Sequence, residues 1–120
     1  MRVIFFGLAI VLCYILWQKW ELTKFRVTEY KVSSTKIKKQ ARVAVIADMH
    51  GFSYGRENRR LLEQVKKLNP HAIFIPGDML VSKYSGTYEV ALRVLQELAR
   101  IAPVYYSYGN HETRLQNPEK

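Results

Sequence analysis

The stretch "HAIFIPGD", residues 71–78, decides the fold that this sequence predicts. Its apolar residues run from Ala72 to Ile75 without interruption and then give way to a proline, a glycine and Asp78. A short, continuous apolar run that stops at turn residues is typical of a strand buried on both faces of a parallel sheet. The stretch therefore predicts a buried strand whose carboxyl end carries a carboxylate.

The same pattern recurs on either side of this stretch. Residues 41–47, "ARVAVIA", and residues 104–109, "VYYSYG", predict two further strands. Residues 56–68 and 87–102 lie between the strands and carry apolar residues at helical spacing, with Thr87 as the expected N-cap of the second helix. The order is strand-helix-strand-helix-strand. Right-handed crossovers turn that order into a parallel α/β sheet with helices packed on it.

An apolar segment opens the chain. Residues 3–17 contain neither a charge nor a proline, and residues 1–20 as a helix are long enough for the roughly 30 Å hydrocarbon core of a bilayer. A cleaved signal peptide would need small residues after this segment, where the chain has "WQKWEL", and a buried soluble helix would need a polar face. We predict an uncleaved single transmembrane anchor over residues 1–20.

Basic residues follow the anchor and predict its orientation. Arg2 lies on one side, and the other side carries Lys19, Lys24, Arg26 and Lys31. The positive-inside rule therefore predicts that the following domain lies in the cytoplasm. The formal net charge of +9 favours anionic partners, and the basic stretch 36–42 lies so near the anchor that anionic lipid is favoured over nucleic acid. The single cysteine, Cys13, excludes an internal disulfide.

Two further segments complete the predicted organisation. Residues 25–32, "FRVTEYKV", alternate and are rich in β-branched and aromatic residues, which predicts an edge strand. Residues 33–40 are polar and basic and predict a connector. The predicted domains are therefore the transmembrane anchor at 1–20, the edge strand with its connector at 21–40, and the α/β domain at 41–120.

Polar residues follow each of the three predicted buried strands at once. They are Asp48 and His50 after the first strand, Asp78 after the second, and Asn110 and His111 after the third. Ligands bind outside the carboxyl ends of parallel strands, so these side chains are expected to converge on one edge of the sheet. Carboxylate, amide and imidazole donors suit Mn, Fe or Zn, and paired divalent cations are the usual means of hydrolysing phosphoesters. Neither an H-E-x-x-H, a G-x-G-x-x-G, a G-x-S-x-G nor a Walker A pattern occurs.

The three strand ends carry the motifs D-x-H at residues 48–50, G-D at 77–78 and G-N-H-E at 109–112. In this respect the chain resembles the calcineurin-like metallophosphoesterases, from about Ala41 to its end. With its apolar N-terminus it is similar to the membrane-anchored bacterial branch of YaeI- and YkuE-type phosphohydrolases. More distantly it resembles UDP-2,3-diacylglucosamine pyrophosphatases.

The resemblance implies a role for each residue of these motifs. The implied ligands of two divalent metal ions are Asp48, His50, Asp78 and Asn110, and Asp78 would bridge the two ions. His111 would be catalytic, either protonating the leaving group or stabilising the charge of the transition state. Glu112 would orient its neighbours.

The resemblance also implies a fold and an activity. The fold would be a transmembrane helix followed by the first β-α-β-α-β half of a metallophosphoesterase β-sandwich flanked by helices. The activity would be two-metal hydrolysis of a phosphomonoester, phosphodiester or pyrophosphate, in a small molecule or in a lipid-linked substrate such as UDP-2,3-diacylglucosamine.

One departure from the family leaves an alternative open. The family's second half supplies further metal-binding histidines that end in a G-H-x-H motif, which this chain lacks, and His71 precedes its strand at the wrong end. The chain is therefore expected either to be a fragment of a longer enzyme or to be a truncated, inactive, membrane-tethered protein that binds or regulates a partner protein. A three-stranded half-sheet leaves an exposed hydrophobic edge, which favours the fragment.

Overall fold

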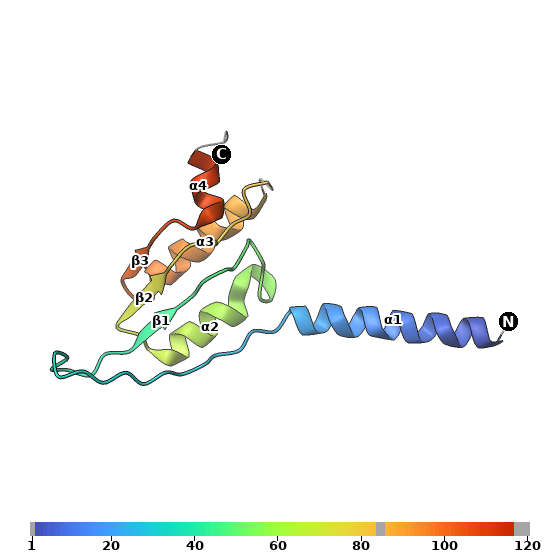
Figure 1. Ribbon diagram of the computed structural model, residues 1–120, viewed down its shortest axis with the longest axis horizontal. Coiled ribbons are helices and arrows are strands. Elements are labelled where there is room, and N and C mark those ends of the chain that lie inside the picture. The colour runs from blue at the N-terminus through green and yellow to red at the C-terminus, as the bar shows by residue number, and fades with distance from the viewer. Residues whose placement is uncertain (1, 84–85, 117–120) are drawn as a thin grey trace. The chain divides into compact units, whose positions relative to one another are not determined.

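The computed structural model describes residues 2–83 and 86–116, and the chain divides into two compact units at residue 31. The first unit contains α1, Arg2–Leu22, a continuous helix of 21 residues (Figure 1). Its window Phe5–Leu22 is long and apolar enough to cross a membrane, and none of that window is buried against the rest of the chain. A signal sequence near an N-terminus would share both properties.

The predicted edge strand at residues 25–32 is wrong. This segment forms no strand in the described structure. Alternating β-branched and aromatic residues indicate only that a segment would fit a pleated surface, because a strand also needs a neighbour whose backbone completes its hydrogen bonds.

The second unit contains a three-stranded parallel sheet in the order β1-β2-β3, as the sequence predicts. Its strands are short: β1 is Val43–Val45, β2 is Ala72–Ile75 and β3 is Val104–Tyr106. The register pairs Ala44 with Ile73 and Phe74 with Tyr105. All three carboxyl ends therefore reach the same edge of the sheet.

Two helices connect the strands (Figure 1). The first connection contains a short 3-10 turn, η1 at Arg56–Asn58, that leads into α2 at Arg59–Leu68. The second contains α3 at Gly86–Ala99, so Thr87 lies inside the helix and is not its N-cap. A further helix, α4 at Asn110–Gln116, follows β3 and was not predicted.

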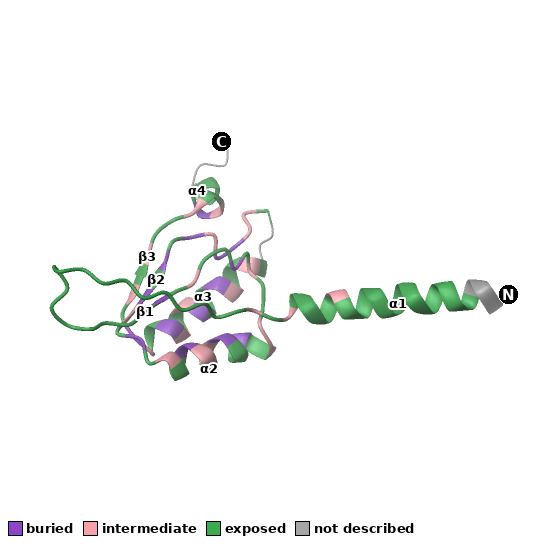
Figure 2. Cartoon of the chain, turned by 60° about the horizontal axis from the view of Figure 1, so that its bottom comes forward, coloured by how far each residue is buried: buried purple, intermediate pink, exposed green. Residues whose placement is uncertain are grey.

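The core lies between the two connecting helices and one face of the sheet. Figure 2 shows the buried stripes of α2 and α3, whose members are Leu61, Val65, Ala91, Val94 and Leu98. The sheet contributes Ile73 and Ile75, which are 0% and 1% exposed. Apolar residues at helical spacing thus meet alternate residues of the strands, and this burial is the main stabilising contribution.

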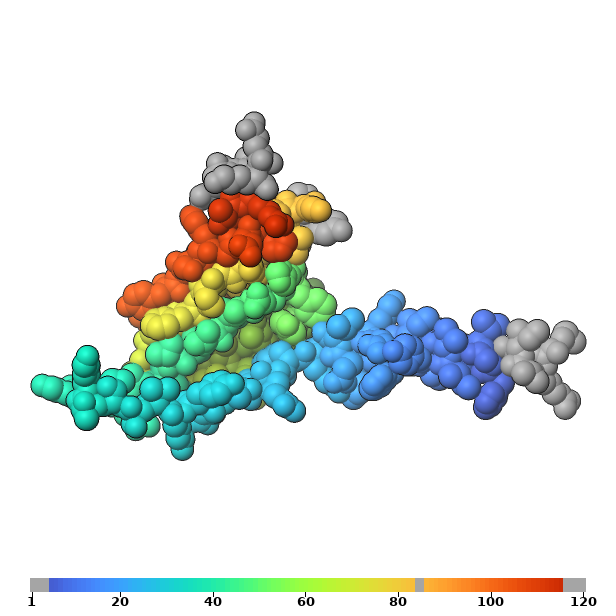
Figure 3. Space-filling view, in the orientation of Figure 1, coloured from blue at the N-terminus to red at the C-terminus, as the bar shows by residue number. Residues whose placement is uncertain are grey.

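The opposite face of the sheet is open, so the prediction that the strands are buried on both faces is wrong. Val45 and Tyr105 are 66% and 62% exposed, and Val43 and Phe74 are exposed too. Figure 3 shows the three strands as adjacent bands on the surface of this unit. A continuous apolar run indicates that both faces suit burial, but no second layer covers this face within residues 32–83 and 86–116.

Arg42 and His71 close the other edge of the sheet. The Arg42 N–H donates to Nδ1 of His71 at 3.0 Å, and the His71 N–H donates to the Arg42 carbonyl at 2.8 Å. The guanidinium of Arg42 also donates to the Leu68 carbonyl at 2.7 Å, which satisfies a free acceptor at the end of α2. His71 therefore has a structural partner at the amino end of β2, away from the strand ends that carry the motifs.

Substitutions on the two faces of β2 should have unequal effects. Ile73→Ala should lower the free energy of unfolding by roughly 2–5 kcal/mol, because it leaves a cavity in the core. Phe74→Ala, one residue along on the open face, should cost clearly less, because this side chain is already 45% exposed. Urea unfolding of both variants in detergent checks this, and equal losses would contradict the one-sided core.

Candidate functional site

The loop after β1 presents Asp48 and His50 to solvent while it buries Met49 between them. Met49 is 2% exposed, whereas the Asp48 and His50 side chains are 72% and 43% exposed. Both polar residues have left-handed backbone conformations, with φ of 54° and 49°. Such conformations are uncommon outside glycine and are kept where surrounding contacts determine them.

Backbone hydrogen bonds supply these contacts by joining the β1 loop to the β2 loop. The His50 N–H donates to the Asp78 carbonyl at 2.9 Å, and the Gly51 N–H donates to the Met79 carbonyl at 2.7 Å. The Asp48 N–H donates more weakly to the Gly77 carbonyl at 3.4 Å. The two loops therefore continue side by side beyond the ends of their strands.

Two glycines bring the β2 and β3 ends into direct contact. Gly77 has a φ of +115°, and a side chain there would overlap the backbone of Gly109. A side chain at Gly109 would overlap Asp78. The sequence indicated that these glycines allow sharp turns. The structure shows that Gly109 is needed for close approach, which places Asp78 against residues 109–111.

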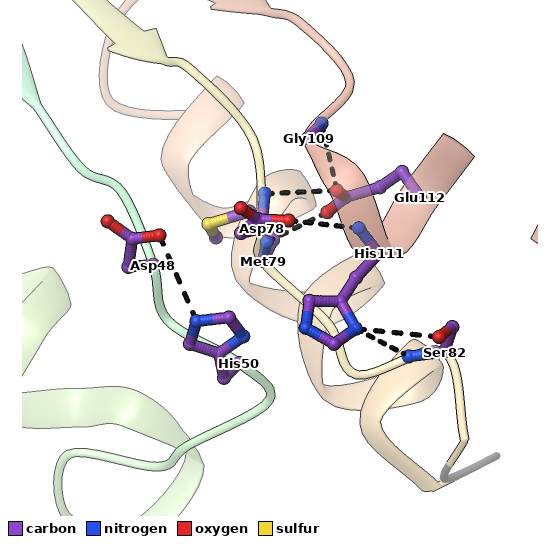
Figure 4. Close-up of polar contacts among 8 residues, drawn as sticks. All are labelled: Asp48, His50, Asp78, Met79, Ser82, Gly109, His111 and Glu112. Atoms are coloured by element: carbon purple, nitrogen blue, oxygen red, sulfur yellow. Dashed lines mark hydrogen bonds and ion pairs between the residues drawn. The ribbon is translucent and has the colours of Figure 1, made fainter. Parts of the chain in front are cut away.

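Glu112 fixes this contact through a buried carboxylate (Figure 4). Its residue is 6% exposed. Its oxygens accept the N–H groups of Asp78 at 3.0 Å, Met79 at 2.8 Å and Gly109 at 3.0 Å. Glu112 is the third residue of α4, and its bond to the Gly109 N–H is half of a capping box. That spacing, a Glu three residues after Gly109, was the sequence signal for α4.

The protonation of Glu112 follows from this environment. Burial favours the neutral carboxyl, but the hydrogen bonds from backbone N–H groups and from the Tyr106 hydroxyl outweigh it and lower the pKa of Glu112. Burial together with the hydrogen bond to Glu112 raises the pKa of Tyr106 well above its usual range. Glu112 is thus an anion held by neutral donors, and Tyr106 remains protonated.

His111 lies at the centre of the strand ends. The backbone N–H of His111 donates to Oδ1 of Asp78 at 3.0 Å. The His111 ring lies edge-on to the His50 ring, with 5.0 Å between the ring centroids. Nδ1 of His111 lies 3.3 Å from the Ser82 backbone nitrogen and 3.4 Å from the Ser82 hydroxyl. The contact with Ser82 was not predicted, because the two residues are 29 positions apart.

The structure thus brings five of the six predicted site residues, Glu112 included, into polar or ring contact with another of them. Nε2 of His50 lies 3.8 Å from Oδ1 of Asp48, and His111 joins His50 and Asp78 (Figure 4). Asn110 begins α4 and is exposed, and its side chain makes no hydrogen bond to the described residues.

The donor set fits a divalent cation by chemistry, because exposed carboxylates and an imidazole are ligands that such ions accept. Both aspartates of the chain, Asp48 and Asp78, belong to this set. In residues 2–83 and 86–116, however, no three His, Cys, Asp or Glu side chains are close enough together to hold a metal ion. The described residues alone therefore do not form a metal site.

A family model for calcineurin-like phosphoesterases matches residues 41–120. The chain belongs to the calcineurin-like phosphoesterase family. This membership supports hydrolysis of phosphoesters and the use of divalent metal ions. The matched residues include the three strands and the loops that carry the site. No curated protein matches the sequence.

Loss of the Glu112 charge should destabilise this calcineurin-like unit. Glu112→Gln should lower the free energy of unfolding by roughly 1.5–3 kcal/mol, the contribution of hydrogen bonds to a charged group. Glu97→Gln is the control, because Glu97 pairs with Arg100 on the surface and should cost less than about 1 kcal/mol. Urea unfolding at pH 7 measures both, and equal losses would contradict the role of Glu112 in holding the loops after β2 and β3 together.

The difference between wild type and Glu112→Gln should also depend on pH. The pKa of Glu112 is lower in the folded state than its ordinary value of 4.5, so its stabilising effect is fully present above that value. The effect should be lost as the pH falls through the folded pKa. The difference in stability between the two proteins should therefore shrink as the pH is lowered below 4.5, and a constant difference would contradict the assignment.

Proposed function

We propose that this protein is a membrane-anchored phosphohydrolase that uses two divalent metal ions. The supporting observation is that three separate strand ends place Asp48, His50, Asp78 and His111 at one edge of the sheet. Four side chains from three loops, held by backbone hydrogen bonds and a buried carboxylate, form a prepared site. Such preorganisation is what phosphoryl transfer requires of a protein.

The residues would divide the work as follows. Asp48 and His50 would hold one cation, and Asp78 would hold both, as the resemblance to the family implies. In the described structure Oδ1 of Asp78 accepts the backbone N–H of His111, and Oδ2 accepts no hydrogen bond from the described residues. Asn110, exposed at the start of α4, would complete the second position and contact the phosphate. When bound, the ions would neutralise phosphoryl oxygens and lower the pKa of the attacking water.

His111 would act on the oxygen that leaves phosphorus. Its backbone is fixed by Asp78 and its ring by Ser82, so the imidazole has a defined position beside His50. It would either protonate the leaving oxygen or stabilise the negative charge that develops there. Glu112 would keep Asp78 and Gly109 in place without touching the substrate.

The complete site would need ligands from residues outside this sequence. Of the three histidines in the chain, His71 is bound to Arg42 at the far edge of the sheet, which leaves His50 and His111 at the site. We therefore infer that these residues belong to a longer enzyme. Its substrate would be a phosphomonoester, phosphodiester or pyrophosphate, and a lipid-linked compound would suit a protein of the membrane-anchored YaeI- and YkuE-type branch.

The anchor would be α1. Its apolar window spans 18 residues, and Lys24 folds back over Trp20 at 3.4 Å from the ring centroid, an arrangement suited to the interface of a bilayer. The excess of basic residues after α1 supports a cytoplasmic domain.

A second function has an observation of its own in its favour. The open sheet face formed by Val43, Val45, Phe74 and Tyr105 would bind a partner protein, and among the described residues no three potential metal ligands lie close enough together to hold an ion. On that reading the protein would be a catalytically inactive, membrane-tethered binding protein. It predicts no metal-dependent hydrolysis from the native gene product.

Removing the carboxylate of Asp78 separates the two functions. Asp78→Asn in the full-length gene product should reduce Mn²⁺-dependent hydrolysis of bis-p-nitrophenyl phosphate by roughly 100-fold or more, because even residues that only orient metal ligands are worth roughly 10–100-fold. His71→Asn is the matched control and should retain activity. Full activity in Asp78→Asn would refute the site, and no activity in the wild type would favour the binding protein.

A charge in the middle of α1 should impair membrane insertion. Leu12→Arg adds a cost of roughly 2.5–3.5 kcal/mol at the centre of a spanning helix, so a smaller share of the protein should remain in membranes after alkaline carbonate washing. Gln18→Arg, near the helix end, should have a weaker effect because its side chain can reach the interface. Release of the wild type by carbonate would contradict the anchor.

A further inference from the structure

Thr87 binds the backbone of Val81 in the loop between β2 and α3. The Val81 N–H donates to the Thr87 hydroxyl oxygen at 3.0 Å, and the Thr87 hydroxyl donates to the Val81 carbonyl at 3.0 Å. Both backbone groups of Val81 are therefore bound by one side chain from the first turn of α3. Thr87 also lies against Gly51, where a side chain would overlap it. These contacts fix the direction of the peptide group between Val81 and Ser82.

The N–H of this peptide group belongs to Ser82 and points at the imidazole of His111. The Ser82 nitrogen lies 3.3 Å from Nδ1 of His111. A backbone N–H can only donate, so Nδ1 must be the acceptor and carry no proton. The Ser82 hydroxyl lies 3.4 Å from the same atom and is compatible with an unprotonated Nδ1, whose one lone pair it would share with the N–H. In the neutral imidazole the one ring proton therefore resides on Nε2.

The opposite side of the ring faces the site. The His111 ring meets the His50 ring at 82° with 5.0 Å between centroids, and the His111 backbone is tied to Asp78. Figure 4 shows Nδ1 directed at Ser82 and the other ring nitrogen on the side of His50. The Nε2 proton is thus on the side of His50, one of the residues proposed to hold a metal ion.

We propose that Ser82 is a positioning residue that holds His111 as its Nε2–H tautomer, so that the ring donates a hydrogen bond from Nε2 to an oxygen of the reacting phosphate. The catalytic use of this hydrogen bond rests on the proposed phosphoesterase function. It selects between the two roles open to His111: delivery of the Nε2 proton would leave an imidazolate anion, whereas donation of a hydrogen bond stabilises developing charge without transfer. In this reaction the oxygen of water forms the new P–O bond and its proton passes to solvent, the P–O bond to the leaving group breaks with its electron pair going to the leaving oxygen, which takes a proton from solvent, and the imidazole keeps its proton.

His71 provides a reference within the same chain. Its Nδ1 accepts the Arg42 N–H at 3.0 Å, which is the same kind of contact at the other end of the sheet. His71 and His111 should therefore both be fixed in the Nε2–H tautomer. His50 has no such N–H donor at Nδ1 among the described residues.

The test is a long-range ¹H–¹⁵N correlation spectrum of the imidazoles in the metal-free full chain, solubilised in detergent and held at a pH where the rings are neutral. His111 should show an unaveraged acceptor-type shift at Nδ1 and a protonated-type shift at Nε2, as His71 does. Averaged shifts, which indicate a free ring, or a proton on Nδ1 would overturn the proposal.

Variants test whether Ser82 is responsible. Ser82→Asp places a carboxylate beside Nδ1 and should draw the proton from Nε2 to Nδ1, and Thr87→Val should release Val81 and produce averaged shifts. Ser107→Asp is the control, because Ser107 is exposed and contacts the Pro76 carbonyl, and it should leave His111 unchanged. A wild-type spectrum of His111 in both Ser82→Asp and Thr87→Val would overturn the assignment.

Kinetics then separate this proposal from the proposed function. In the active full-length protein, Ser82→Asp should lower kcat by roughly 100-fold with little change in KM, since one donor to a developing oxyanion is worth about 10²–10³. An unchanged kcat together with the shifted tautomer would refute the catalytic use of the Nε2 hydrogen bond. The predicted spectra in a protein without any hydrolytic activity would refute the phosphoesterase and leave the positioning of His111 standing.

Discussion

The buried carboxylate of Glu112 is the interaction on which the site depends. It binds three backbone N–H groups, from Asp78, Met79 and Gly109, and so joins the loops after β2 and β3. The contact is possible only because Gly77 and Gly109 have no side chains to separate those loops. A charged acceptor that satisfies several otherwise free donors is strong and directional, which explains how the two loops can hold a fixed geometry.

The other features of the site follow in order from these hydrogen bonds of Glu112. Asp78, fixed at its own N–H, accepts the His111 N–H, and its carbonyl accepts the His50 N–H. The left-handed conformations of Asp48, His50 and Asp78 are then stabilised by these contacts and present their side chains at one edge. The helices α2 and α3 contribute indirectly, by packing on one face of the sheet and fixing where its strands end.

Local patterns predicted the parts of this arrangement that depend on local structure. Strand order, helix positions and the polar residues at the strand ends follow from periodicity, turn residues and the rule for parallel sheets. Local patterns could not predict contacts between distant segments, such as the contact between Ser82 and His111, which are 29 positions apart. The coverage of the sheet also depends on other layers, so apolar runs could not show that Val45 and Tyr105 are exposed, nor could the alternation at 25–32 supply a neighbouring strand.

If these strand ends form part of a metal site, they should bind Mn²⁺ in the folded protein. Titration of the ¹⁵N-labelled full chain with Mn²⁺ in detergent tests this, because the ion broadens the NMR signals of nearby nuclei. Broadening is expected first at residues 48–50, 77–78 and 109–112, while the signals of His71, at the far edge of the sheet, should stay sharp. Broadening centred elsewhere, or none at all, would contradict a metal site at these strand ends.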